Sequence, residues 1–407
     1  MRKKLLSLLV LLITAVSGAM AQTTYKVSVK EGTEDATNWT ITPAEATTTG
    51  VAQGTQVTAS YGGVKKVKSV KAVKKAPAGP PSWKLTLSSP AKDLYITANG
   101  GLIAQQTLDV ASTEFTVEMP ELTSQTVNIV ATDGSGNCWY CTQENMSFAI
   151  GQTYQSSPTM TALGTESSAD VYKMTAAGTI PDGKTVVLSG VTISYDQIAC
   201  SGDATIILMG ANTVTAANNT AAIKIGDSGT TLTITGSGSL TATGGMFGAG
   251  IGTDVVTSGT LSGGNIVING GTVTATGGNY GAGIGTGQPQ NATNTCGNIT
   301  INGGTVIAQG GNLGGAGIGT GVSLQSSGKT ASNTCGAITI GTGVKSVTAN
   351  KSSNNPGPNS IGKGRSNNGT QACGTITIGG TIYWDGSDYQ NGGESYLGSD
   401  ITYPPVP

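Results

Sequence analysis

Three cysteines recur at the same position of a repeated segment, and their spacing is the first feature that suggests chemistry. Cys296, Cys335 and Cys373 each precede a glycine and a short run of alternating apolar residues. If the segments stack as coils about 4.8 Å apart, the Cα atoms come within disulfide range. We favour a buried thiol stack, because a disulfide between Cys296 and Cys335, the alternative, leaves the third thiol over. Identical positions along a rod do not converge on a tetrahedral zinc site.

A second cysteine pair, Cys138-Trp-Tyr-Cys141, has the spacing of a thioredoxin-like redox motif. That motif opens a helix beside a βαβ unit, whereas the residues around this pair resemble a strand. Residues three apart on a strand point to opposite faces. We therefore expect neither redox chemistry nor an unstrained local disulfide here.

Carboxylates are the remaining candidates for catalysis. The chain contains no histidine, which is the commonest general base. Glycoside hydrolysis needs clustered carboxylates, and a lyase needs calcium ligands beside a basic residue. Acidic and basic residues are few and scattered between Pro181 and Asp388. We therefore expect no enzyme and no cofactor, and the sequence gives no support for a calcium site.

A glycine-rich phrase, Gly-Ala-Gly-Ile, has the composition of a loop that cradles phosphate. It returns after each pair of strand-like runs, with no helix pattern behind it and no Lys-Ser/Thr pair to complete a P-loop. Its recurrence favours a narrow coil corner where glycines leave room and isoleucine is buried. The predicted buried column consists of Ile251, Ile284, Ile318 and Ile361.

The repeats themselves predict a solenoid. In Ile299-Thr-Ile301 the isoleucines should point inward and the threonine outward, and Val306 and Ala308 should point inward from the next strand. No repeat can bury its apolar face alone, so the coils must stack, while the loops absorb changes in repeat length. We predict a parallel β-helix over residues 166–386 with roughly six or seven coils, and a C-terminal cap over 387–407.

The segments before the repeats indicate export and two smaller β modules. Residues 1–21 combine three basic residues, an apolar run and a small-x-small cleavage site, as a signal peptide does. We expect a small β module over 22–75, a proline-rich linker over 76–81 and a β-sandwich-like module over 82–165. Loss of the three basic residues takes the net charge from −1 to −4. The mature chain then has no predicted membrane span and no electrostatic case for binding nucleic acid.

The repeat phrases resemble a family of exported proteins from gut anaerobic bacteria. The phrases are Cys-Gly-Asn-Ile-Thr-Ile301, Gly-Ala-Gly-Ile-Gly285 and the closing Gly-Gly-Thr-Ile-Tyr-Trp-Asp-Gly386. The resemblance covers about residues 170–400 and implies an all-β chain with a right-handed parallel β-helix, and some members are described as carbohydrate-binding. It implies a cell-surface or secreted location, with the periplasm as an alternative. No catalytic residues come with it.

Three functions remain open: a non-catalytic adhesin or carbohydrate-binding protein, a structural spacer, and a polysaccharide lyase. The first is favoured, with a polysaccharide or a host or envelope glycan as its partner. Its contacts would come from the aromatic residues near the C-terminus or from outward threonines of the rod. The predicted contact residues are Trp384, Tyr383, Tyr389, Thr272 and Thr274.

Overall fold

The structure is a computed structural model that divides the chain into two compact units, residues 1–79 and 80–407. It describes residues 79–324, 330–352 and 358–404, except for the side chain of Asn367. Before residue 79 it describes the backbone of seven strands. These are β1 (Val10–Val16), β2 (Thr24–Glu31), β3 (Glu34–Asp35), β4 (Trp39–Thr42), β5 (Val51–Ala52), β6 (Gln56–Tyr61) and β7 (Val64–Lys71).

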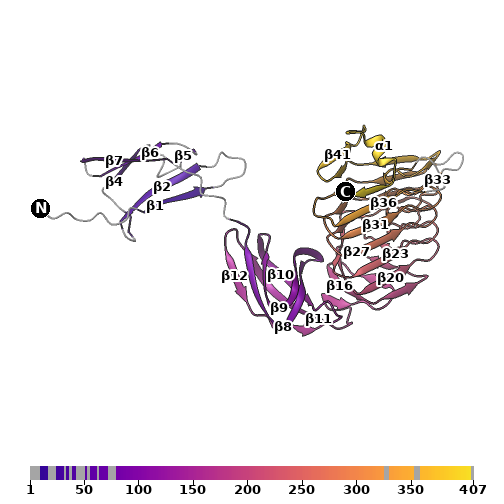
Figure 1. Cartoon of the computed structure of the whole chain (residues 1–407), viewed down its shortest axis with the longest axis horizontal. Coiled ribbons are helices and arrows are strands. Elements are labelled where there is room, and N and C mark those ends of the chain that lie inside the picture. Colours follow the sequence, from indigo (N-terminus) through magenta and orange to yellow (C-terminus); the bar gives the residue numbers. More distant parts are fainter. Residues whose placement is uncertain are drawn as a thin grey trace. The chain divides into compact units, whose positions relative to one another are not determined.

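The first unit consists of two antiparallel sheets (Figure 1). One contains β1, β2, β3 and β5, and the other contains β4, β6 and β7. Strand β1 is the apolar run of the predicted signal peptide, and it pairs with β2. The predicted cleavage site lies outside the described residues, as does most of the predicted linker.

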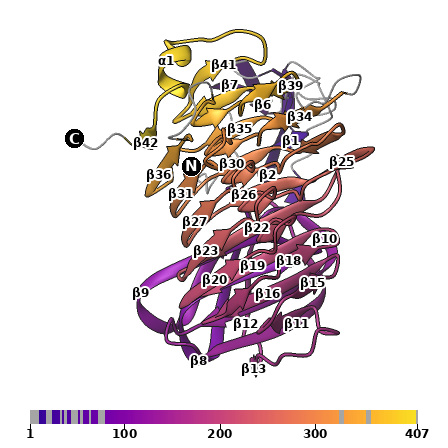
Figure 2. The same ribbon diagram turned by 90° about the vertical axis from the view of Figure 1, so that its right-hand side faces the viewer.

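In the second unit the chain winds into a parallel β-helix whose first face is the longest sheet (Figure 2). Eight of its nine strands are parallel, and β41 closes it antiparallel. We call this sheet face one. It comprises β14 (Val171–Lys173), β16 (Lys184–Ser189), β19 (Ala204–Met209), β22 (Thr231–Gly236), β26 (Asn265–Ile268), β30 (Ile299–Ile301), β35 (Ile338–Ile340), β40 (Ile376–Ile378) and β41 (Thr381–Trp384).

The chain then turns into face two, whose strands alternate inward Val, Ile, Leu and Ala with outward polar residues. This alternation is the pattern of a strand with one buried face. Face two ends antiparallel at β42. It comprises β17 (Thr192–Ser194), β20 (Ala211–Thr215), β23 (Ser239–Thr243), β27 (Thr272–Thr276), β31 (Thr305–Gln309), β36 (Ser346–Asn350) and β42 (Ile401–Tyr403).

Face three completes each coil with two or three residues per strand. Its isoleucines at 251, 284, 318 and 361 pair in register, and all four side chains are fully buried. The predicted column is therefore confirmed. Face three comprises β15 (Gly178–Ile180), β18 (Ile198–Cys200), β21 (Ile223–Lys224), β24 (Ile251–Gly252), β28 (Ile284–Gly285), β32 (Ile318–Gly319) and β37 (Ile361–Gly362).

Six coils carry a strand on all three faces, which confirms the predicted parallel β-helix. The later coils add a fourth face that the sequence analysis assigned to loops. Two of its strands carry the tetrads Thr-Asn-Thr-Cys and Ser-Asn-Thr-Cys, whose asparagine and cysteine point inward. Face four comprises β25 (Thr260–Ser262), β29 (Thr293–Cys296), β34 (Ser332–Cys335) and β39 (Thr370–Cys373), with a small sheet of β33 (Ser323–Leu324) and β38 (Ser366–Asn367) beside it.

Residues 82–165 form one six-stranded sheet, which we call the docking sheet. Trp83, Leu85, Phe115 and Phe148 are buried in a core of its own. Register shifts in the pairing of β8 with β9 interrupt these two long strands between Thr86 and Asp93. The strands are β8 (Ser82–Ala98), β9 (Gly101–Glu118), β10 (Leu122–Thr132), β11 (Cys138–Phe148), β12 (Thr153–Ser156) and β13 (Thr161–Ala162).

The docking sheet packs on the outer side of face one. Tyr95 and Val130 of the sheet share a buried cluster with Val187, Ile207 and Met209, which point outward from the rod. This contact explains why every residue of β19 is buried, since both of its faces are covered.

The turn between β8 and β9 requires glycine because it touches the rod. Gly100 has a φ of 75°, and a Cβ there would lie 2.6 Å from the carbonyl oxygen of Asp203. Its own carbonyl oxygen accepts a hydrogen bond from the Thr205 hydroxyl. A second hydrogen bond between rod and docking sheet joins the hydroxyls of Thr185 and Thr97 at 2.9 Å.

The C-terminal end of the rod is covered by β41, β42 and the short helix α1 (Gly393–Leu397). Leu397 and Ile401 are buried against the last coil. Within the part of the chain that the structure describes, no helix has the length and apolarity to cross a membrane.

Replacing Ile207 by alanine should lower the free energy of unfolding by about 2–5 kcal/mol, because it leaves a cavity between rod and docking sheet. Urea denaturation measures the loss. Ile307→Ala, on the exposed side of face two, is the matched control and should change stability by less than about 0.5 kcal/mol. Equal losses for both variants would contradict the burial of Ile207.

Candidate functional site

The aromatic residues predicted to contact ligand lie in the C-terminal cap, and Trp384 is buried there. Its side chain is 8% exposed, and its indole N–H donates to the Cys373 carbonyl oxygen at 3.1 Å. The Lys363 amine lies 4.1 Å from the ring centroid, and the Tyr389 ring packs edge-on at 4.9 Å. Trp384 therefore presents no open ring face here, and it serves to close the rod.

The other two predicted aromatic residues are more accessible. Tyr383 stacks on Tyr396 with ring centroids 4.4 Å apart, so one of its faces is covered. Tyr389 is 40% exposed. Ligand contact at Tyr383 and Tyr389 stays a prediction.

Thr272 and Thr274 lie on β27, with their side chains outward from face two. Thr272 pairs in register with Ser239 of β23 and Thr305 of β31. Thr274 pairs with Thr241 and Ile307 of the same two strands. Threonine suits an outward strand position for local reasons alone. These two contacts also remain predictions.

The predicted thiol stack is present. Cys296, Cys335 and Cys373 pair in register on β29, β34 and β39, and all are buried free thiols. Hydrogen bonds to the two neighbouring thiols, together with burial, raise the pKa of Cys335 well above its usual value. The Cys335 thiol therefore stays protonated, and the three buried side chains act as packing groups.

The Cys138 and Cys141 pair lies on strand β11, as expected, and the two side chains point to opposite sides. Cys138 packs toward the rod, whereas Cys141 lies against the core of the docking sheet. Burial raises the pKa of Cys138 to about 12. Both are free thiols, and nothing in their placement supports dithiol chemistry.

The structure reveals a different candidate surface at the turn from face two to face three. Here Phe247 N–H donates to Asn218 O, Tyr280 N–H to Met246 O, and Leu313 N–H to Asn279 O. Successive turns are thereby stacked on one another. We call this row, together with Tyr195 at the corresponding turn of an earlier coil, the corner ridge. It comprises Tyr195, Asn218, Met246, Phe247, Asn279, Tyr280, Asn312 and Leu313.

The corner ridge presents aromatic and apolar side chains to solvent. The rings of Phe247 and Tyr280 stack at 5.3 Å with an interplanar angle of 24°. Met246 beside them is 43% exposed, and Asn279 is exposed too. Tyr195, at the same turn of an earlier coil, is 84% exposed and has a φ of 59°. A bulky residue at positive φ is uncommon and occurs most often at functional sites.

The ridge is held from behind by the loops that follow face three. The carbonyl oxygens of Phe247 and Tyr280 accept hydrogen bonds from the backbone of Gln288 and Val322. Asn219 O accepts in the same way from Val255 N–H. The aromatic side chains therefore stand on a rigid backbone, which limits the entropy lost when a ligand binds.

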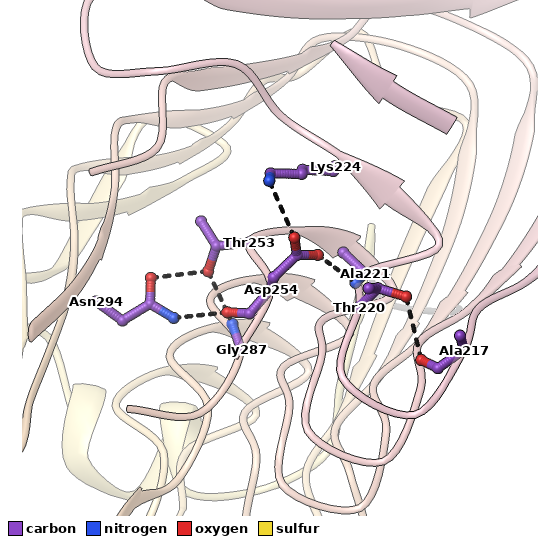
Figure 3. Close-up of polar contacts among 8 residues, drawn as sticks. All are labelled: Ala217, Thr220, Ala221, Lys224, Thr253, Asp254, Gly287 and Asn294. Carbon is purple, nitrogen blue, oxygen red and sulfur yellow. Dashed lines mark hydrogen bonds and ion pairs between the residues drawn. The ribbon is translucent and has the colours of Figure 1, made fainter. Parts of the chain in front are cut away.

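An ion pair fixes the base of the ridge (Figure 3). The Lys224 amine lies 3.0 Å from Asp254 Oδ2, and Asp254 Oδ1 accepts from Ala221 N–H at 2.8 Å. The Thr220 hydroxyl, next to Ala221, donates to Ala217 O at 3.1 Å. Asp254 thus ties the loop after β24 to the turn of the preceding coil.

A buried polar ladder lies behind this ion pair (Figure 3). The Thr253 hydroxyl donates to Asn294 Oδ1 at 2.9 Å and accepts from Gly287 N–H at 3.0 Å. Asn294 Nδ2 donates to Asp254 O at 3.0 Å. Buried polar groups need such partners, so the inward asparagine of face four is explained by structure.

The exposed ridge residues offer flat apolar rings and neighbouring amides without a nucleophile or base among them. Rings of this kind pack on apolar faces while polar groups beside them form hydrogen bonds. The ridge was not predicted, because the repeated Gly-Ala-Gly-Ile segment was interpreted only as a corner of the coil. The available signal was the pair of residues before Gly-Ala-Gly, Met246-Phe247 and Asn279-Tyr280, which are bulky where the corner needs only glycine.

A family model described as a beta helix repeat matches residues 232–254, 266–288 and 299–322. Each matched segment contains one turn of the corner ridge. Comparison with curated proteins and with solved structures finds no match. The family match supports the parallel β-helix.

Asp254→Asn should lower stability by about 0.5 kcal/mol at low salt, because it keeps the acceptor for Ala221 N–H and loses only a partly exposed ion pair. Asp254→Ala also removes the acceptor and should cost about 1–3 kcal/mol. Urea denaturation in low and high salt separates the loss of the ion pair from the loss of the hydrogen-bond acceptor, because salt screens only the ion pair. An equal cost for both variants would contradict the role given to Oδ1.

Stability should fall as the pH rises from about 9 toward 12. Burial raises the pKa of Cys200 to about 12, so its thiol ionises more readily in the unfolded chain than in the folded one. The loss approaches about 1.4 kcal/mol per pH unit for each such thiol. Denaturation curves across this range should show a shallower fall for Cys200→Ala, and an unchanged slope would contradict the assignment.

Proposed function

We propose that the chain is an exported, non-catalytic protein of the cell surface or surroundings that binds carbohydrate through its corner ridge. The observation that carries this proposal is the row of exposed and half-buried aromatic and apolar side chains along one corner of the rod. Tyr195 is the most exposed large side chain of the row.

The geometry supports a polymeric ligand. Ridge side chains repeat from coil to coil along the rod, and successive coils lie about 4.8 Å apart. Asn279 and Asn312 are exposed beside Tyr280 and Leu313, and their amides can donate to and accept from hydroxyl groups. A polysaccharide offers repeated apolar ring faces edged by hydroxyls, which matches this arrangement.

Two of the rod carboxylates have structural partners that account for them without catalysis. Asp254 is paired with Lys224. Asp385 accepts hydrogen bonds from the backbone of Asp388 and Ser387, and these lower its pKa to about 2. A general acid needs a pKa near the working pH instead. The roles of these two carboxylates support a binding protein rather than a polysaccharide lyase. If the protein were a structural spacer, the corner ridge would have no ligand.

Tyr195→Ala should weaken binding to a polysaccharide that a glycan array identifies by about 5- to 30-fold, the usual cost of truncating a central aromatic contact. Tyr280→Leu should also weaken it, and it should fold because Leu313 occupies the equivalent position in the next coil.

Val110→Ala, at an exposed position of β9 in the docking sheet, is the control and should bind as the unchanged protein does. If the array finds no ligand, or if the ridge variants retain full affinity, the spacer function replaces carbohydrate binding.

A further inference from the structure

The buried polar ladder continues along the rod, and its middle rung is not closed by a direct hydrogen bond. Each rung places a buried threonine of the loop after face three beside an amide side chain of face four. The three threonine hydroxyls each accept from a glycine N–H of the following coil, and the three amide residues pair in register. In the first and third rungs the hydroxyl also donates to the amide oxygen. The rungs are Thr253 with Asn294, Thr286 with Asn333, and Thr320 with Gln371.

The middle rung leaves an amide oxygen without a donor. Asn333 is fully buried, and its Nδ2 donates to the carbonyl oxygens of Gly287 and Gly321 at 3.1 and 3.0 Å. Within the part of the chain that the structure describes, its Oδ1 has no hydrogen-bond partner. Two carbonyl groups hold the amide nitrogen, and the short side chain does not carry the oxygen to the Thr286 hydroxyl. A buried acceptor that no donor reaches is costly, so this oxygen requires another partner.

A second buried polar atom of the same coil also lacks a partner. Gln288 is fully buried, and its Oε1 accepts from Gln290 Nε2 at 2.8 Å. Its own Nε2 has no acceptor among the described residues. The backbone N–H of Gln288 donates to Phe247 O, and Val255 and Val322 make the equivalent bond in the flanking coils. A glutamine therefore occupies a position where its neighbours are valines, so apolar packing does not account for it.

Two glycines of the loops after face three bring these groups together. Asn333 Nδ2 bonds the carbonyl oxygen of Gly287, in the peptide group that joins Gly287 to Gln288. The Thr286 hydroxyl accepts from Gly321 N–H at 3.0 Å, and Asn333 Nδ2 bonds the carbonyl oxygen of the same glycine. The middle rung therefore combines an oxygen that needs a donor, a hydroxyl that can donate, and an N–H group that needs an acceptor.

We propose that the middle rung binds one internal water molecule, which accepts from the Thr286 hydroxyl and Gln288 Nε2 and donates to Asn333 Oδ1. Three hydrogen bonds are the usual number for a buried water. A cation does not fit these partners, because it would face the N–H group of Gln288. The described chain also sets no three acidic or cysteine side chains together to hold a metal ion. The carboxylate of the ladder, Asp254, is already paired with Lys224.

This water site lies behind the corner ridge and supports its backbone. Gln288 N–H donates to Phe247 O at 2.9 Å, and Val322 N–H, next to Gly321, donates to Tyr280 O at 2.8 Å. A water at the middle rung therefore joins the two loops that hold the stacked rings. The site does not depend on what the ridge binds.

A crystal structure of the full chain, at a resolution that shows ordered water, tests the proposal directly. The expected result is one peak of density within about 2.7–3.2 Å of Thr286 Oγ1, Gln288 Nε2 and Asn333 Oδ1. The proposal is overturned by the absence of a peak, by a peak that contacts fewer than these three atoms, or by a direct hydrogen bond between Thr286 and Asn333. A peak surrounded only by oxygens at about 2.3–2.6 Å would show a calcium ion instead and would also overturn it.

Asn333→Gln tests the same site in solution, because the next rung already carries glutamine at this position. There Gln371 Nε2 donates to Gly321 O and Arg365 O, while its Oε1 accepts from the Thr320 hydroxyl. The longer side chain should therefore close the middle rung directly and release one long-lived internal water, which oxygen-17 relaxation dispersion counts. The melting temperature should change by less than about 2 °C.

Asn294→Gln is the matched control, because Asn294 already bonds the Thr253 hydroxyl and an added methylene has no gap to span. It should release no water and should lower the melting temperature by about 3–8 °C through overpacking. An unchanged water count in Asn333→Gln, or the loss of one water in both variants, would overturn the proposal. An equal fall in melting temperature for both would do the same, because it would show that glutamine does not close the middle rung.

Discussion

Each coil of the rod lies directly on the backbone of the coil before it, and at the corner between faces two and three no space remains for a side chain. A Cβ on Gly278 would lie 1.6 Å from the carbonyl oxygen of Gly245, and one on Gly311 would lie 1.8 Å from that of Gly278. This close approach keeps the coils in register. The buried isoleucines and the thiols then align in columns, and the bulky residues beside the glycines are pushed to the outside, where they form the corner ridge.

The same rod shows two kinds of outer surface. Where the docking sheet covers face one, apolar side chains such as Val187 and Ile207 point outward and are buried. Beyond the sheet, outward residues of face one such as Thr300 and Thr339 are partly exposed. Because the docking sheet covers only one part of face one, a cleft lies at the junction between the sheet and the rod. The corner ridge lies on a different edge and stays open.

The sequence predicted the parallel β-helix and its isoleucine and cysteine columns, because stacking identical positions produces a repeat that can be counted. It did not predict face four, because the Thr/Ser-Asn-Thr-Cys tetrad occurs only twice and its asparagine is typical of a loop. The structure shows that the Thr253 hydroxyl donates a hydrogen bond to the inward Asn294. The sequence predicted ligand contact at Trp384, because the burial of this side chain depends on the fold of the cap and is not visible in the sequence. The docking sheet was missed as a partner of the rod, though the unbroken apolar run of β19 carried that signal.

Covalent footprinting of the rod, with and without a bound polysaccharide, is the most direct test of ligand contact at the corner ridge. The measurement compares the labelling of aromatic and aliphatic side chains at single-residue resolution. Protection confined to Tyr195, Met246 and Tyr280 is the predicted result. Protection at Tyr383 and Tyr389 instead, with the ridge labelled equally in both states, would contradict it.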